Sequence, residues 1–245
     1  MKFLTRTTTV ACTVSICISL AFQVAPYVAA AEGHPKVQAE KGWRSLFNGV
    51  DLTGWDFRDM KGGTPASDTW AAEDGTLTRK GNAYISTKEK FGDFVLDMEF
   101  KVGARTNSGI FIRYEPKYSA GLRKYWTNGA LEIQLLDSFG KTEPGRHDCC
   151  SLYDLVAPST NPMKKPGEWN RVTITARGSN ITIVLNNKTV VNADLDEWSE
   201  AKKNPDGTPN KYEKPIKDAP REGYIVLQDH PGDIWFRNIN ILPLR

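Results

Sequence analysis

The sequence predicts an all-β protein, a jelly-roll β-sandwich of two antiparallel sheets. Short segments in which apolar and polar residues alternate recur along the chain, as in strands with one buried face. Turn residues separate these segments, for example Glu73-Asp74-Gly75 and Asn186-Asn187. Many short strands joined by turns, with little helical patterning, are typical of a sandwich or jelly roll.

The predicted elements follow this alternation. At 172–176 and 181–185, apolar residues occupy every second position, which indicates half-buried strands. One helix is predicted at 195–203, because Asp194 can cap it and apolar residues recur there at helical spacing. The charged, turn-rich segment 204–215 is expected at the surface, either beside a binding site or in solvent. In chain order, the predicted strands are 43–47, 76–79, 83–86, 94–102, 109–114, 131–136, 169–176, 181–185, 189–193, 223–230 and 234–241.

The N-terminus has the pattern of a secretory signal peptide. Lys2 and Arg6 precede a mostly apolar run at 10–22, and small residues follow at 28–31. The run is short and rich in Thr and Ser for a membrane span. We therefore expect a signal peptide at 1–31, a leader segment at 32–42 and a single domain at 43–245, periplasmic or secreted, with no membrane span after cleavage.

Composition argues against nucleic acid as a partner. Removing residues 1–31 takes away two basic residues and no acidic one, so the net charge falls from +3 to about +1. Nucleic acids and anionic membranes are bound through concentrated Lys and Arg, which a nearly neutral domain lacks. Cys149 and Cys150 are the cysteines left after processing. They are expected to be either a strained vicinal disulfide or two small semi-buried residues, and they lack the spacing of a zinc site.

Three predicted strands carry polar side chains where a buried strand would be apolar. Glu132 and Gln134 share one face of their strand, and Gln228 and His230 share one face of theirs. Arg113 alternates with apolar neighbours in the same way. We expect these side chains to form a functional face, and the alternative is a polar sheet face that only contacts water.

Catalytic roles are assigned to Glu132 and His230. Histidine accepts protons near neutral pH, which makes His230 a candidate base, and His147 in a loop is the second choice. Arg113 and Arg237 could hold a substrate oxygen, or each could be an ion-pair partner of Glu132 in a structural network.

Further substrate contacts are expected from amide and aromatic side chains. Gln134 and Gln228 can hydrogen-bond a sugar, and Tyr125, Trp126 and Tyr153 have faces on which sugar rings stack.

Six motifs follow one another along the chain: LFNGVDLTGW at 46–55, NSGIFIR at 107–113, EIQ at 132–134, YD at 153–154, PGEWN at 166–170 and the segment 223–241. In this order they resemble the 3-keto-disaccharide hydrolase family, formerly DUF1080, over about residues 43–244. The resemblance implies a concanavalin A-like lectin/glucanase sandwich, exported by bacteria that degrade glycans, and cleavage of 3-keto-glycosides by hydrolysis or by elimination followed by hydration. The oligosaccharide or glycoside substrate is the expected partner.

The chemistry implied by this resemblance needs one base, a stabiliser for an enolate oxygen and a proton donor. Glu132 or His230 would be the base, and Arg113, Gln228 or Arg237 would hold the keto oxygen. A divalent metal could serve as stabiliser instead, with Glu132, Asp137 and His230 as ligands, although no metal-binding spacing is legible in the sequence.

Two other functions fit the same residues. One is a non-catalytic carbohydrate-binding module, since a fold alone does not define a function. The other is a retaining glucanase that uses Glu132 and Asp137. These residues lie five apart and have opposite parity, so this function requires a β-bulge between them.

Overall fold

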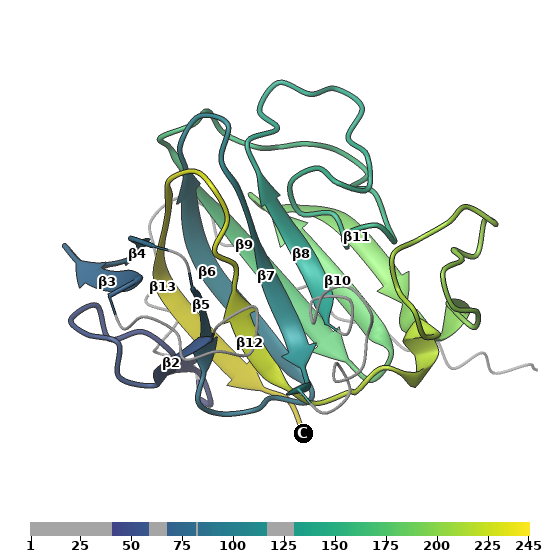
Figure 1. Ribbon diagram of the computed structural model, residues 1–245, viewed down its shortest axis with the longest axis horizontal. Coiled ribbons are helices and arrows are strands. Elements are labelled where there is room, and N and C mark those ends of the chain that lie inside the picture. Colours follow the sequence, from purple (N-terminus) through teal and green to yellow (C-terminus); the bar gives the residue numbers. More distant parts are fainter. Residues whose placement is uncertain (1–40, 59–67, 82, 117–129) are drawn as a thin grey trace, which may run out of the picture. The chain divides into compact units, whose positions relative to one another are not determined.

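The computed structural model describes residues 41–58, 68–81, 83–116 and 130–245. These residues form two antiparallel sheets that pack face to face, as Figure 1 shows, which confirms the predicted all-β sandwich. Tyr125, Trp126 and the predicted signal peptide lie outside the described residues.

The larger sheet has eight strands. Its order is β11 (Lys188–Asp194), β10 (Asn180–Leu185), β9 (Trp169–Arg177), β6 (Phe94–Val102), β13 (Ile234–Pro243), β4 (Thr76–Arg79) and β3 (Trp70–Glu73), and β1 (Arg44–Ser45) also pairs with β13.

The smaller sheet has five strands, and in Figure 1 it lies in front of the larger one. Its order is β2 (Trp55–Arg58), β5 (Tyr84–Thr87), β12 (Tyr224–Leu227), β7 (Asn107–Tyr114) and β8 (Leu131–Leu136).

The hydrophobic core lies between the two sheets. Every second residue of each strand points inward, so the apolar half of the alternating pattern becomes buried. Burying one such Leu or Ile side chain contributes about 1.5–3 kcal/mol relative to leaving it exposed. Fully buried members include Ile110, Ile112, Ile133 and Leu135 of the smaller sheet and Leu96, Met98, Val172 and Ile174 of the larger one.

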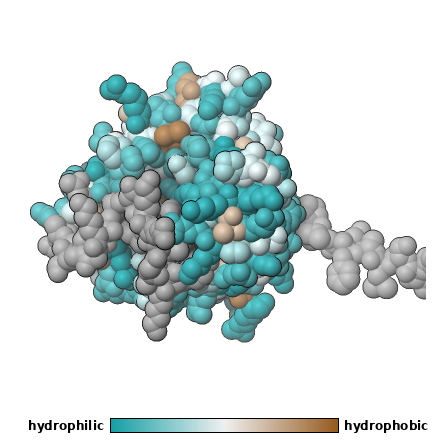
Figure 2. Space-filling view, turned by 45° about the vertical axis from the view of Figure 1, so that its right-hand side comes forward, coloured by the Kyte–Doolittle hydropathy of each residue, from teal (hydrophilic) through white to brown (hydrophobic). Residues whose placement is uncertain are grey.

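Outside the core, the surface is largely polar. Over the described residues visible in Figure 2, hydrophilic colour dominates and apolar colour forms small separate patches. Within the described part of the chain, Val50 and Phe139 are the exposed large hydrophobic residues. No helix in that part has the length and apolar character needed to cross a membrane.

The prediction of a helix at 195–203 is wrong beyond the first turn. A 3₁₀ turn, η3 (Leu195–Glu197), forms with Asp194 as its cap, whose side chain accepts a hydrogen bond from the Asp196 backbone N. Trp198 then leaves the helical path, buries its ring and donates from Nε1 to Asn204 Oδ1 at 2.8 Å. Tertiary burial of this ring overrides the local spacing. A second 3₁₀ turn, η4 (Ile216–Asp218), follows, and β2 and β3 are strands that the sequence pattern did not predict.

Candidate functional site

The outer face of the five-stranded sheet carries a buried carboxylate. Glu132 lies on β8 and is 4% exposed, and its Oε1 accepts a hydrogen bond from Gln228 Nε2 at 3.0 Å. Gln228 follows β12, which is separated from β8 by β7 (Figure 1). Gln134 lies two residues beyond Glu132 on the same regular strand and therefore on the same face. The predicted placement of Glu132, Gln134 and Gln228 on one face is found in the structure.

A lysine that the sequence pattern missed completes the carboxylate's surroundings. Lys211 Nζ lies 2.7 Å from Glu132 Oε2, and the two side chains are 20% and 6% exposed. The same ammonium lies 4.3 Å from the centre of the Tyr153 ring, a favourable cation–π distance. Lys211 belongs to the turn-rich excursion at 204–215, so the composition of that segment was the one available indication.

One aspartate connects two loops beside this pair. Asp154 Oδ2 accepts from the Lys211 backbone N at 2.5 Å, and its Oδ1 lies 3.1 Å from His147 Nε2. Asp154 adopts φ +66°, a left-handed conformation that Asp tolerates better than most residues. The His147 ring packs on Tyr153 with 4.6 Å between centroids, and its side chain is 62% exposed. The site therefore holds a surface His–Asp pair next to the buried Glu–Lys pair.

The tyrosines around Glu132 remain neutral hydrogen-bonding groups. Burial and then the Glu132 charge raise the pKa of Tyr153 and of Tyr212. Burial also raises the pKa of Tyr84, reinforced by Glu132 and Asp229 and opposed by a hydrogen bond with Gln228. Phenols with raised pKa values keep their protons at neutral pH and can donate them to an oxygen atom.

Arg113 is not part of this face, contrary to the expectation from strand parity. It adopts φ +54° where the pairing of β7 with β12 shifts register, so a bulge turns its side chain away from the outer face. The side chain is 1% exposed and donates to Gly92 O and Gly178 O, with Asp93 Oδ1 3.0 Å from Nη2. Arg113 therefore ties loops at one end of the sandwich together.

Arg237 belongs to the other sheet, on β13. Its Nε lies 2.7 Å from Glu99 Oε2, and its guanidinium lies 4.0 Å from the centre of the Trp169 ring. The expected ion pair with Glu132 is wrong, because the partner of Arg237 is Glu99, and the larger sheet to which β13 belongs does not carry Glu132. Strand parity indicates which side of a sheet a residue takes but not which of two sheets the strand joins.

His230 lies beyond the last residue of β12, where strand parity no longer applies. Its side chain is exposed and Nε2 lies 3.4 Å from Asn107 Nδ2. The Glu132 oxygens contact Lys211 and Gln228 instead.

Asp137 does not join Glu132. The pairing of β7 with β8 continues without a register shift to Leu136, and Asp137 Oδ2 accepts from the Arg105 backbone N at 2.9 Å. The bulge that a two-carboxylate glucanase requires is absent from β8. The metal-ligand set of Glu132, Asp137 and His230 is not brought together either, and in the described part of the chain no three His, Cys, Asp or Glu side chains gather in a way that could hold a metal.

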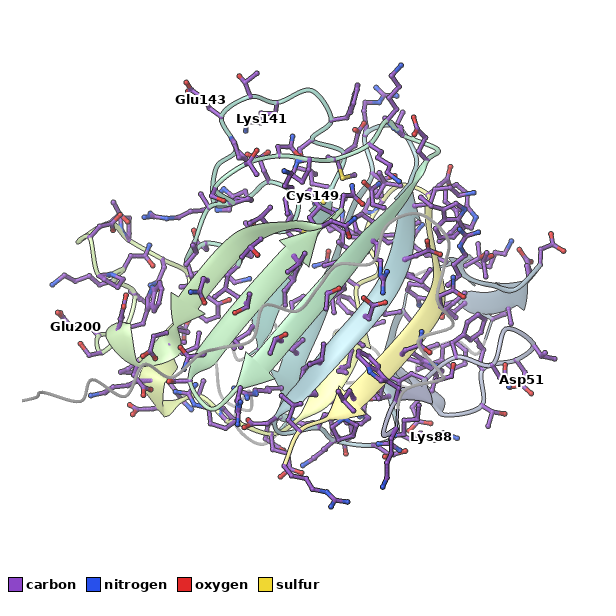
Figure 3. All side chains as sticks on the ribbon, turned by 180° about the vertical axis from the view of Figure 1, so that it is seen from behind. Asp51, Lys88, Lys141, Glu143, Cys149 and Glu200 are labelled. Carbon is purple, nitrogen blue, oxygen red and sulfur yellow. The ribbon has the colours of Figure 1, made fainter. Side chains whose placement is uncertain are left out.

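Cys149 and Cys150 are buried free thiols. A hydrogen bond with Cys149 and burial raise the pKa of Cys150 well above its usual value, which keeps that thiol protonated. In Figure 3, Cys149 lies nearer the sheets than Lys141 and Glu143, which project from the same connection. The vicinal disulfide is therefore not formed, and the two residues are buried more completely than the expected semi-buried pair.

Comparisons of the sequence with known proteins find a matching family and a named relative. Residues 42–242 match the family described as 3-keto-alpha-glucoside-1,2-lyase-like domain. A 3-keto-disaccharide hydrolase of Bacteroides thetaiotaomicron is 26% identical over 228 residues, which cover 82% of this chain and 78% of that protein.

Two solved structures with similar sequences have the same fold. A candidate glycosyl hydrolase from Parabacteroides distasonis is 32% identical with a TM-score of 0.69, over 82% of this chain and 99% of that one. A second from the same species is 25% identical with a TM-score of 0.65, over 83% and 94% of the two chains. The chain therefore belongs to the family of 3-keto-alpha-glucoside-1,2-lyase-like domains.

Proposed function

We propose that this protein cleaves 3-keto-glycosides on the outer face of the five-stranded sheet. The observation that carries the proposal is the buried Glu132 carboxylate, held between Lys211 at 2.7 Å and Gln228 at 3.0 Å. A base next to a fixed cation is the pair that proton abstraction beside a ketone requires. The family membership and the relative named as a 3-keto-disaccharide hydrolase support a glycoside substrate.

The proposed reaction starts at C2 of the keto sugar. A ketone at C3 acidifies the C2 hydrogen, so Glu132 removes it as a proton and the electron pair moves into an enolate. The Lys211 ammonium and the Gln228 amide stabilise the negative C3 oxygen. The enolate electrons then form the C1–C2 double bond as the C1–O bond breaks, and the leaving oxygen takes a proton. Addition of water across that double bond completes net hydrolysis, and omission of this step makes the reaction an elimination.

The leaving-group proton is assigned to the His147–Asp154 pair. His147 is exposed and hydrogen-bonded to Asp154, so it can exchange protons with solvent between turnovers. Its ring packs on Tyr153, which is also in contact with Lys211. His230 stays a prediction as the alternative base.

The test is incubation of the purified protein with a disaccharide and with its 3-keto derivative, followed by mass spectrometry of the products. Cleavage of the keto form alone is expected. In D₂O, abstraction at C2 is expected to place deuterium at C2 of the hydrated product. Glu132→Gln is expected to lower kcat by at least about 100-fold, because a general base is removed.

Two histidine variants test the assignment of the proton donor. His147→Gln is expected to lower kcat by about 10- to 100-fold, and His230→Gln serves as its matched control with nearly unchanged kcat. The reverse order would move the role to His230. If the wild-type protein binds the keto sugar but releases no product, the protein is a sugar-binding module instead.

We also infer that the protein is exported as a periplasmic or secreted protein, on the basis of the signal-peptide pattern at 1–31. N-terminal sequencing of the protein recovered from its native host tests this inference. A mature chain that begins near residue 31 is expected, and an intact Met1 would overturn it.

A further inference from the structure

Two buried glutamines next to Glu132 have their amide orientations fixed by acceptor groups. Gln228 Nε2 donates to the Glu132 carboxylate at 3.0 Å, and Gln134 Nε2 donates to the His147 carbonyl oxygen at 3.3 Å. A carboxylate and a carbonyl can only accept, so the NH₂ group of each amide must point toward them. The two carbonyl oxygens, Oε1 of each glutamine, must then point elsewhere.

Both of these oxygens are left without a partner. Among the residues that the structure describes, neither Gln134 Oε1 nor Gln228 Oε1 has a hydrogen-bond partner, and the residues are 4% and 7% exposed. An unsatisfied buried acceptor costs roughly 1–3 kcal/mol, so such groups require an explanation. At a binding face, the explanation is a ligand that supplies the missing donors.

A glycine lies between the two amides. Gly109 of β7 pairs with Gln134 on one side, and its carbonyl accepts from the Gln228 backbone N at 2.8 Å on the other. A Cβ at Gly109 would lie 3.0 Å from Glu132 Oε1 and 3.3 Å from Glu132 Cγ. The Glu132 carboxylate therefore lies over Gly109, between the two glutamines, whose strands are about 10 Å apart, and a side chain at position 109 would crowd it.

The charges around these amides favour a neutral ligand. Glu132 is already paired with Lys211, so a cationic donor would meet the Lys211 ammonium and an anion would meet the Glu132 carboxylate. Hydroxyl groups are neutral donors, and a sugar ring presents several of them on one side. Asn107 Oδ1, two residues before Gly109 on the same strand, is a third buried oxygen without a partner in the described chain and extends the row of acceptors along β7.

We propose that Gln134 and Gln228 form an acceptor pair that requires two free hydroxyl groups on the keto-sugar ring and thereby sets substrate specificity. This proposal rests on the proposed function, since it names the hydroxyl groups of the substrate that the same site would recognise. A ring that lacks one of the two hydroxyls leaves a buried amide oxygen unpaired. A site built to hydrogen-bond a hydroxyl discriminates strongly against analogues without it.

The experiment separates binding from turnover. Affinity is measured by calorimetry for a carbon-linked 3-keto-disaccharide, in which a CH₂ group replaces the glycosidic oxygen and cannot leave, and for its 2-deoxy, 4-deoxy and 6-deoxy forms. We expect two of the deoxy forms to bind roughly 10- to 100-fold more weakly to the wild-type protein. In Gln134→Met and Gln228→Met, each of which removes one acceptor, discrimination against one deoxy form is expected to disappear. Asn192→Ala, an exposed position on β11, is the control variant with unchanged discrimination.

A purely structural role for the glutamines would weaken all ligands equally and leave the ratios between them unchanged, which would overturn the proposal. Equal wild-type affinity for all deoxy forms would also overturn it, whether or not the oxygen-linked substrate is cleaved. Discrimination without cleavage of the oxygen-linked substrate would support the acceptor pair and reject the proposed enzymatic function.

Discussion

Replacing Lys211 with methionine tests whether the Glu132–Lys211 pair is a buried unit. The variant leaves Glu132, whose side chain is 6% exposed, without its cation. Removing one partner of a buried ion pair typically costs about 3–5 kcal/mol. Lys211 is 20% exposed and Glu132 keeps its hydrogen bond from Gln228, so we expect a smaller cost than for a fully buried pair, about 2–3 kcal/mol. For a domain of this size that corresponds to a fall in Tm of about 5–10 °C.

The chain offers a matched control for this variant. Lys203 and Glu200 form an ion pair at 2.9 Å, but the side chains are 49% and 64% exposed. Lys203→Met is therefore expected to change stability by no more than about 0.5 kcal/mol, because exposed pairs contribute little. Thermal unfolding followed by circular dichroism at pH 7.5 measures both variants.

A double variant sharpens the result. Glu132→Gln combined with Lys211→Met removes both charges, so it is expected to be more stable than Lys211→Met alone. The reasoning is refuted if Lys211→Met and Lys203→Met unfold at the same temperature, or if the two substitutions at the pair simply add. Lys211→Met is also expected to lower kcat by about 100-fold or more, because the enolate oxygen loses the cation that stabilises it.

Three further predictions concern other parts of the structure. Gly223→Ala is expected to destabilise the protein by more than about 3 kcal/mol, since the new Cβ would lie 2.4 Å from the Arg113 carbonyl carbon. Gly92→Ala, whose Cβ has an ordinary 3.7 Å contact, is the control, and unfolding in denaturant measures both variants. Equal unfolding midpoints would contradict the clash. Arg113→Met should cost about 2–4 kcal/mol in the same measurement, because Asp93 and two carbonyl oxygens lose their donor, and a neutral result would show that water replaces it. In an absorbance titration of the folded protein, the buried tyrosines should ionise above the ordinary tyrosine pKa of about 10. Because their pKa values are raised in the folded protein, the stability that they contribute is present below pH 10 and falls as the pH rises further. Tyrosines that all ionise together near pH 10 without unfolding would contradict the burial of Tyr84, Tyr153 and Tyr212.

Strand periodicity predicted the part of the site that regular strands carry. Glu132 and Gln134 lie on an unbroken strand, so a period of two places them correctly, and the core residues follow from the same rule. The prediction failed for Arg113, because a bulge with a positive φ reverses the facing. A bulge of this kind has no distinct sequence pattern when the residue is not glycine.

The loop residues of the site depend on contacts that local patterns do not encode. Lys211 lies 79 positions from Glu132, and the loop that carries Asp154 connects Lys211 to His147. Sequence composition indicated a surface excursion there but gave no information about its partner across the fold. The same limit explains Arg237, whose strand joins the larger sheet.

The position of β13 has a consequence for the time at which the fold can form. This last strand lies inside the eight-stranded sheet, between β6 and β4, and also pairs with β1 near the start of the domain, where Arg44 is opposite Ile241. Contacts between residues so far apart in sequence close the largest loops and form slowly. Until residues 234–243 are available, β4 and β3 have no neighbour on that side and the central apolar surface stays open. Formation of the eight-stranded sheet must therefore wait for residues 234–243, and a chain without them would lose an interior strand of that sheet.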